Sequence, residues 1–385
     1  MPIFTRAFFL SALALIAGCA GGPRDNSGAL NSEQNAQFVE RPTESFVPPP
    51  LFQTTPPKPI FQSTNELPPT FHTNFSAPPK TNPIVPVKSP PRQVPGIFTS
   101  LNNWAVDNQL NPPARLTSSP VVTYAISSRN GICVLEIGSH EATWRGMTVH
   151  LGFTPEMIDG QIFVHGLDII KTLSPLLVGP SANFSAHKTI VIDPGHGGIN
   201  GGTVASDRRA EKEFTLDWAR RLGSLMAAQG WTVFLTRTND TDVSLSNRVA
   251  VAEAHHADLF VSLHFNSSAP DHRQSGLETY CLTPTGMPST LTRGYSDVWT
   301  DVYPNNAYDV ENLQLAVRLH AALLTAGGAE DRGIRRARFM GVLLGQRRPA
   351  VLIEGGYLSN ARELEKIESG SYRQQLAEAV ANALR

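Results

Sequence analysis

The stretch KTIVIDPGHGG, residues 188–198, decides the fold of the C-terminal half of the chain. Its first residues are apolar or β-branched, which predicts a buried strand, and the Pro-Gly-His-Gly-Gly sequence after them predicts a tight turn. Beyond the turn, residues 212–230 carry apolar side chains at helical spacing and end at Gly230, which predicts a helix. A strand that passes through a glycine-rich turn towards a helix is typical of an α/β fold.

Strands and helices keep alternating towards the last residue. Four apolar runs predict further strands at residues 232–236, 259–266, 277–282 and 350–354. Helices are predicted over residues 244–257 and 312–326, and two short helices close the chain. The alternation predicts an α/β domain over residues 187–385, with a mostly parallel or mixed sheet and helices on both faces.

Residues 118–180 predict a small α+β domain that precedes the α/β domain. A short helix is expected over residues 168–177, after four β-rich runs at residues 121–126, 133–138, 147–152 and 161–166. The pattern resembles the small copper-amine-oxidase N-terminal-like domain. We expect a positioning or wall-contacting module without chemistry of its own.

Residues 20–117 have the composition of a disordered linker. Of the 30 prolines in the chain, 18 fall between Pro42 and Pro113. Proline removes backbone hydrogen-bond donors and blocks helix formation, so this segment predicts an extended tether.

The first 19 residues predict a lipoprotein signal peptide. Arg6 precedes an apolar run that is too short to span a membrane, and the run ends in Ile16-Ala17-Gly18-Cys19. This ending resembles the bacterial lipobox, which implies lipidation of Cys19, a membrane anchor and a periplasmic protein held at the outer membrane. The alternative is an ordinary signal peptide on a secreted or soluble periplasmic protein.

The overall composition excludes other classes of protein. The formal charge of -1 and the pI near 6.8 lack the basic excess of nucleic-acid-binding proteins, so no nucleic-acid partner is expected. Three cysteines are too few for a disulfide framework, and they form no Cys-x-x-Cys pair, which excludes a zinc ribbon.

Four polar residues lie at the positions where such a fold carries its sites. His196 follows the first strand, His264 ends the run LFVSL, Glu354 ends AVLI, and Glu211 opens the first helix. The carboxyl ends of parallel strands meet at one edge of a sheet. Two imidazoles and a carboxylate around an open coordination position form a hydrolytic zinc site, and a further carboxylate must move the proton of the attacking water. The sequence offers His196, Glu211 and His264 as Zn²⁺ ligands and Glu354 as base and acid.

Several neighbours have alternative roles. Glu213 is the rival of Glu211 as a ligand. Asp193 either orients His196 through its second ring nitrogen or fixes the turn by backbone hydrogen bonds. Asn266 either contacts substrate or shapes its loop, and Arg248 is expected to form a structural ion pair.

Six motifs carry a resemblance to the zinc-dependent N-acetylmuramoyl-L-alanine amidase family. They are VIDPGHGG, AEKEFTLD, the pair VFLTR and SLSNRVAVA, LFVSLHFN, GLETYCL and AVLIEGGYLSN, in the order and with the spacing of that family. The resemblance covers residues 187–385. It implies that His196, Glu211 and His264 bind zinc and that Glu354 is catalytic.

The segment from Pro284 to Glu311 departs from part of that family. Some members carry a long helix here that plugs the zinc site until a partner removes it. This segment is polar and lacks a sustained apolar face, so we predict a loop that borders the substrate groove, with Trp299 and Tyr303 as candidates for sugar stacking or for packing.

The sequence thus predicts a peptidoglycan hydrolase. It would use water activated by zinc to cleave the amide bond between N-acetylmuramic acid and L-alanine. The partners expected are peptidoglycan, the membrane through the lipid anchor, and unidentified division or envelope regulators. The alternatives are a non-catalytic cell-wall-binding protein and a zinc exopeptidase of similar architecture.

Overall fold

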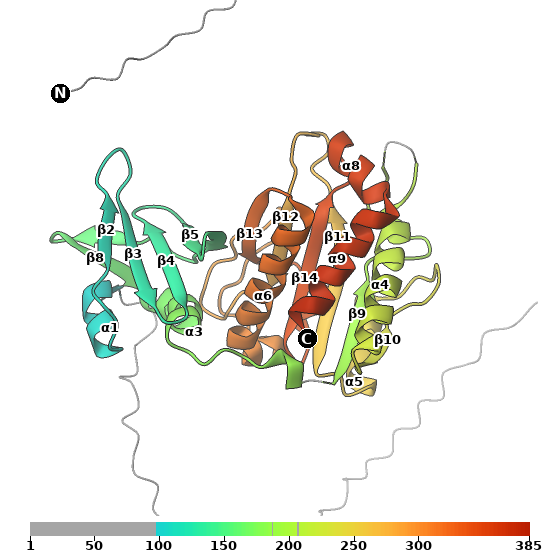
Figure 1. Ribbon diagram of the computed structural model, residues 1–385, viewed down its shortest axis with the longest axis horizontal. Coiled ribbons are helices and arrows are strands. Elements are labelled where there is room, and N and C mark those ends of the chain that lie inside the picture. Colours follow the sequence, from blue (N-terminus) through green and yellow to red (C-terminus); the bar gives the residue numbers. More distant parts are fainter. Residues whose placement is uncertain (1–97, 187, 206–207) are drawn as a thin grey trace, which may run out of the picture. The chain divides into compact units, whose positions relative to one another are not determined.

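The computed structural model describes residues 98–186, 188–205 and 208–385 (Figure 1). The signal peptide, Cys19 and the linker up to residue 97 lie outside the described residues. None of the helices in the described ranges has both the length and the apolar character needed to cross a bilayer.

The C-terminal half is built on six strands. In chain order they are β9 (Thr189–Pro194), β10 (Thr232–Leu235), β11 (Leu259–Asn266), β12 (Leu277–Cys281), β13 (Asp331–Arg336) and β14 (Ala350–Tyr357). In space the order is β10-β9-β11-β14-β12-β13. The first four strands pair in parallel, β12 is antiparallel to β14, and β13 is parallel to β12. The predicted mixed sheet is confirmed.

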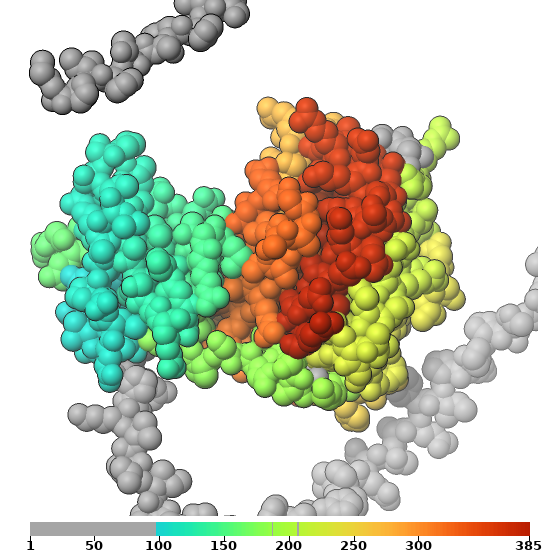
Figure 2. Space-filling view, viewed as in Figure 1, coloured from blue at the N-terminus to red at the C-terminus, as the bar shows by residue number. Residues whose placement is uncertain are grey.

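Helices cover both faces of this sheet. They are α4 (Glu211–Ala228), α5 (Leu245–Ala254), α6 (Asp309–Gly327), α7 (Gly341–Leu344), α8 (Ala361–Glu368) and α9 (Gly370–Ala383), with a 3₁₀ turn, η3, at Pro304–Tyr308. Helices α4 and α6 both pack against α9, and Figure 2 shows α6 (orange) and α9 (red) side by side at the surface.

The side chains of β9 and β11 show that the helices occupy opposite faces. Ile190 and Val261 belong to the hydrophobic core that includes α4, α6 and α9, whereas their neighbours Val191 and Phe260 belong to a second core that includes α5 and α7. Successive residues of a strand point to opposite faces, so the two cores lie on either side of the sheet. The predicted arrangement of helices is therefore confirmed.

The N-terminal part continues the same sheet. Its elements are β1 (Phe98–Ser100), α1 (Leu101–Asp107), β2 (Ala114–Thr117), β3 (Thr123–Ser128), β4 (Gly131–Glu136), β5 (Glu141–Trp144), β6 (Met147–His150), β7 (Glu156–Ile158) and β8 (Gln161–His165), then the helical segments α2 (Gly166–Asp168), η1 (Ile169–Leu173), α3 (Ser174–Leu177) and η2 (Phe184–Ala186). Strands β6-β5-β4-β3-β2 extend the large sheet beyond β13, and β1-β8-β7 form a small separate sheet.

The boundary of this part differs from the prediction. Residues 98–117, which the sequence assigned to the disordered linker, form β1, α1 and β2. Leu101, Trp104 and Ala105 are buried at helical spacing on α1. This apolar face is short and lies in a proline-rich stretch of sequence, so it was not recognised as a helix.

Side chains also join the N-terminal part to the C-terminal half. Arg336 of β13 is buried and donates hydrogen bonds to Oγ1 of Thr172 at 2.9 Å and to the carbonyl of Lys171 at 2.7 Å. Lys171 forms an ion pair with Asp309 at the start of α6, at 2.9 Å. The two parts thus share a sheet and a set of polar contacts.

Candidate functional site

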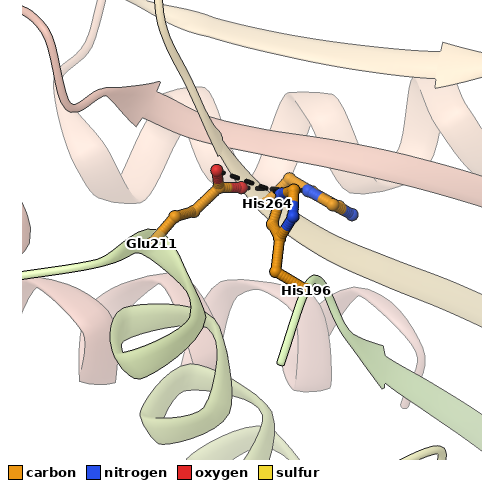
Figure 3. A group of neighbouring side chains, drawn as sticks. All are labelled: His196, Glu211 and His264. Carbon is orange, nitrogen blue, oxygen red and sulfur yellow. Dashed lines mark hydrogen bonds and ion pairs between the residues drawn. The ribbon is translucent and has the colours of Figure 1, made fainter. Parts of the chain in front are cut away.

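The strand order brings three of the predicted residues together. His196 follows β9, Glu211 begins α4 and His264 lies near the end of β11 (Figure 3). Nε2 of His196 lies 3.1 Å from Oε2 of Glu211, and Nδ1 of His264 lies 2.9 Å from Oε1 of the same carboxylate. The candidate ligand atoms of all three residues lie within 4.8 Å of one another, so these residues could hold a metal ion.

The donor set and its spacing fit Zn²⁺. Two atoms bound to a tetrahedral zinc at about 2.0–2.1 Å are separated by about 3.3 Å. The separations of 2.9 and 3.1 Å between the carboxylate oxygens and the ring nitrogens are close to that value. Imidazole nitrogen and carboxylate oxygen are common zinc ligands in hydrolytic enzymes.

The three groups change one another's pKa values. Burial favours the neutral acid of Glu211, but the hydrogen bonds from His196 and His264 outweigh burial and hold the pKa of Glu211 well below its ordinary range. Burial likewise opposes protonation of His196, yet the hydrogen bond to Glu211 raises the pKa of His196. The carboxylate therefore favours positive charge at this point, as a metal ligand should.

The turn that carries His196 is held by two arginines. His196 has a φ of 60°, in the left-handed region that a residue with a Cβ rarely adopts. Arg248 donates to the carbonyls of Pro194 and His196 at 2.8 and 2.7 Å, and Arg237 donates to the carbonyl of Gly195 at 2.8 Å. These hydrogen bonds fix the backbone that aims the His196 ring.

Two glycines allow the close approach of the site residues. A Cβ at Gly195 would overlap the imidazole of His264. A Cβ at Gly202 would lie 2.5 Å from Oε2 of Glu211 and 2.6 Å from the His196 ring. Only glycine fits at these positions without displacing a site side chain.

Glu354 lies beside His264 and has an unusual environment. The two residues are directly paired in the parallel ladder of β11 and β14. Glu354 is 6% exposed, and its Oε2 atom has no hydrogen-bond partner. Burial raises the pKa of Glu354 to about 8. A carboxyl group of this kind can exchange a proton near neutral pH.

All four residues line one cavity of about 400 Å³. Its remaining walls come from the glycine-rich loop after β9, the end of β11, the loop after β12, the segment before α7, and β14: Gly202, Thr203, Phe265, Asn266, Ser267, Arg293, Phe339, Met340 and Leu352. The cavity therefore has room for a substrate group next to the candidate ligands.

The residues next to the candidate ligands differ in part from the prediction. Asp193 does not contact the His196 ring; its buried carboxylate accepts hydrogen bonds from Thr236, Arg248 and Ser262 at 2.5, 2.6 and 2.6 Å. The predicted orienting contact is therefore wrong. The alternative of backbone hydrogen bonds also differs from the structure, because all three partners are side chains; Asp193 acts on the turn through Arg248, which donates to the carbonyls of Pro194 and His196. Arg248 forms the expected ion pair. The residue that meets Nδ1 of His196 is Asn200, whose Oδ1 lies 2.9 Å away.

Glu213 and Asn266 have well-defined partners. The carboxylate of Glu213 accepts a hydrogen bond from the backbone nitrogen of Ala210 at 3.3 Å and so caps α4 away from the histidines. Asn266 donates to Glu278 at 2.8 Å and accepts from Arg293 at 2.8 Å, and it lines the cavity. Its amide is thus fixed by partners on both sides.

The segment after β12 is the predicted loop as far as η3. Trp299 packs edge-on against Phe153, with ring centroids 6.1 Å apart, and Tyr303 donates to Asp301 at 3.0 Å. Neither aromatic residue lines the cavity, whereas Arg293 of the same loop does. Nothing in the sequence singled out Arg293 or Asn200. Arg293 binds Asn266, which is distant in sequence, and Asn200 is one polar residue of the glycine-rich loop that carries His196.

Known proteins resemble the C-terminal half of the chain. The model of a family described as N-acetylmuramoyl-L-alanine amidase matches residues 190–385. The amidase LytC of Bacillus subtilis is 32% identical over 196 residues, which are 50% of this chain and 34% of that protein. The amidase AmiC of Escherichia coli is 31% identical over 240 residues, 55% of this chain and 56% of that protein. The chain thus spans about a third to just over half of the length of these relatives.

Solved structures give similar matches. An N-acetylmuramoyl-L-alanine amidase from Clostridium difficile 630 has a TM-score of 0.43 at 31% identity and covers 52% of this chain and 95% of that one. The catalytic domain of CwlV from Bacillus (Paenibacillus) polymyxa has a TM-score of 0.42 at 33% identity, with 51% and 95% covered. Since the family model matches just over half of the chain, from β9 to the last residue, the chain belongs to the N-acetylmuramoyl-L-alanine amidase family.

Proposed function

We propose that this protein hydrolyses the amide bond between N-acetylmuramic acid and the L-alanine of the peptidoglycan stem, with Zn²⁺ as its cofactor. The observation that carries the proposal is the convergence of His196, Glu211 and His264 beside Glu354 in one cavity. Membership of the amidase family supports the choice of bond.

The residues divide the chemistry between them. His196, Glu211 and His264 would hold the zinc ion, which when bound lowers the pKa of water and polarises the scissile carbonyl. Glu354 accepts the proton of the attacking water and delivers it to the leaving nitrogen of L-alanine. A divalent cation held by these three ligands would favour the ionised form of Glu354, which burial and the neighbouring Glu211 carboxylate disfavour.

Product analysis on purified peptidoglycan tests the activity. We expect peptides with a free L-alanine amino terminus and an intact glycan, and we expect a chelator to stop their release. An exopeptidase would leave the stem attached to the glycan, and a wall-binding protein would release nothing. Either outcome would refute the proposed bond.

Substitution of Glu354 tests its role. Glu354→Gln should lower the rate of peptide release by about 10²- to 10⁴-fold, because it removes the group that moves the proton. Zinc content should stay the same, since Glu354 is not among the three ligands. Glu213→Gln is the matched control, because Glu213 only caps α4. Release by Glu354→Gln at the parental rate would show that another group is the base.

We also propose that the protein is a periplasmic lipoprotein, anchored to the outer membrane through Cys19, with residues 20–97 as its tether. The lipobox-like sequence and the proline content support this proposal. Incorporation of labelled palmitate by the wild type and not by Cys19→Ser is the expected result. Equal labelling of both proteins would contradict it.

We further propose that residues 98–180 position the catalytic half on the cell wall. The continuous sheet and the contacts of Arg336 and Lys171 support a fixed orientation of this part. Variants of Arg336 should weaken binding to intact peptidoglycan more than hydrolysis of a small soluble substrate.

A further inference from the structure

Arg293 brings a positive charge into the cavity. It lies in the loop after β12 and lines the cavity together with His264 and Glu354. Its Nη2 atom donates to Oδ1 of Asn266 at 2.8 Å, and its guanidinium carbon lies 5.5 Å from the ring centroid of Phe339. Both partners are uncharged, so they hold the guanidinium in place without neutralising it.

Three other arginines near this site are paired with acids. Arg332 meets Glu278 at 3.0 Å, Arg338 meets Asp297 at 2.6 Å, and Arg248 meets Asp193 at 2.6 Å. Arg293 takes part in none of the ion pairs found in the described part of the chain. Its charge therefore remains available to a ligand in the cavity.

The loop that carries Arg293 has an unusual backbone conformation. Arg293 has a φ of 48° and Gly294 a φ of 77°, so two successive residues adopt the left-handed region. The turn is closed by the hydrogen bond from the nitrogen of Tyr295 to the carbonyl of Thr292 at 2.8 Å. A left-handed conformation is unfavourable for arginine, and such conformations are concentrated at functional sites.

The cavity lining offers two kinds of chemistry. Beside Arg293 and Phe339 it includes the neutral polar residues Thr203 and Ser267, which line a second hollow together with Ser359. Sugar hydroxyl groups suit neutral polar partners, whereas a planar arginine fork suits a carboxylate. In peptidoglycan the second residue of the stem, D-glutamate, carries such a carboxylate, free in some cell walls and amidated in others.

We propose that Arg293 binds the free carboxylate of the second stem residue and thereby makes the enzyme selective for stems in which that group is not amidated. The inference rests on the proposed amidase function and adds a substrate preference to it. Arg293 is here a residue that contacts substrate on the leaving-group side of the scissile amide.

Two soluble muramoyl peptides test this assignment, one with D-glutamate and one with D-isoglutamine as second stem residue. The wild type should favour the acid by about 10- to 100-fold in kcat/KM, as expected for a charge-assisted hydrogen bond. Arg293→Gln should bring this ratio close to one, and Arg293→Lys should keep part of it. Arg115→Gln, in an exposed arginine of β2 at the far edge of the sheet, should keep the wild-type ratio.

Two results would overturn the inference. The wild type could show no preference, or Arg293→Gln could lose activity equally on both peptides, which would assign Arg293 to the reaction itself or to the loop. Binding of both peptides to Glu354→Gln, measured by calorimetry, gives the same comparison without turnover. A wild type that cleaves neither peptide therefore counts against the amidase proposal, whereas equal affinities count against the role of Arg293.

Discussion

Replacement of Arg248 by methionine should weaken both the fold and the metal site. Arg248 is 3% exposed and Asp193 is 1% exposed, and their ion pair has an N–O distance of 2.6 Å. Without Arg248, the Asp193 carboxylate keeps only the hydroxyl groups of Thr236 and Ser262 as partners. Removal of one partner of a buried pair typically costs about 3–5 kcal/mol. We expect the free energy of unfolding, from urea denaturation of the metal-free protein, to fall by that amount.

The same substitution should lower zinc affinity, because Arg248 also binds the carbonyl of His196 and holds its left-handed backbone. We expect a loss of at least about tenfold in a chelator competition assay. Arg220→Met is the control, since Arg220 is exposed and donates only to a carbonyl. The double variant Asp193→Asn/Arg248→Met should be less destabilised than the sum of the single variants, because no charge is left unpaired. A loss below about 1 kcal/mol with unchanged zinc affinity would refute this account of the turn.

Three further changes probe the site. When a chelator has removed the metal, burial raises the pKa of Glu354 to about 8, above its ordinary 4.5. Between these two pH values the folded state keeps a proton that the unfolded state releases. The free energy of unfolding should therefore fall as the pH rises between these values, by up to about 1.4 kcal/mol per unit, and the slope should be flatter in Glu354→Gln. Asn200→Ala should lower zinc affinity by about 10- to 100-fold in chelator competition, because it removes the acceptor that orients His196. Gly195→Ala should reduce the bound zinc per chain, measured by elemental analysis, because its Cβ overlaps His264.

The central sheet could be predicted because its strands are apolar and β-branched. The bounds of β11 match the run LFVSLHFN, and β14 extends the predicted AVLIE by three residues. The four site residues were found because each follows a strand or opens a helix at one edge of the sheet. Local sequence was sufficient where a run of buried side chains defined the element.

Strand β13 could not be found in the same way. Its sequence DRGIRR is mostly charged, which argues against a strand at an inner position of a sheet. The charges are accommodated because Arg332 pairs with Glu278, and Arg336 binds Thr172 and a backbone carbonyl of the N-terminal part. Both partners are distant in sequence. The continuity of the sheet through β13 to β6 depends on these contacts and was missed for the same reason.

Three buried carboxylates meet at this edge of the sheet. Glu354 of β14 pairs with Glu278 of β12 and with His264 of β11, and Glu211 at the start of α4 contacts His264. Burial opposes ionisation of Glu278, but the hydrogen bond from Tyr280 and the charges of Arg335 and Arg332 lower its pKa. The hydrogen bonds from two imidazoles do the same for Glu211. Glu354 has no such partner, and burial raises its pKa. Of the three, only Glu354 can gain and lose a proton near neutral pH, which is the property that the proposed proton transfer requires.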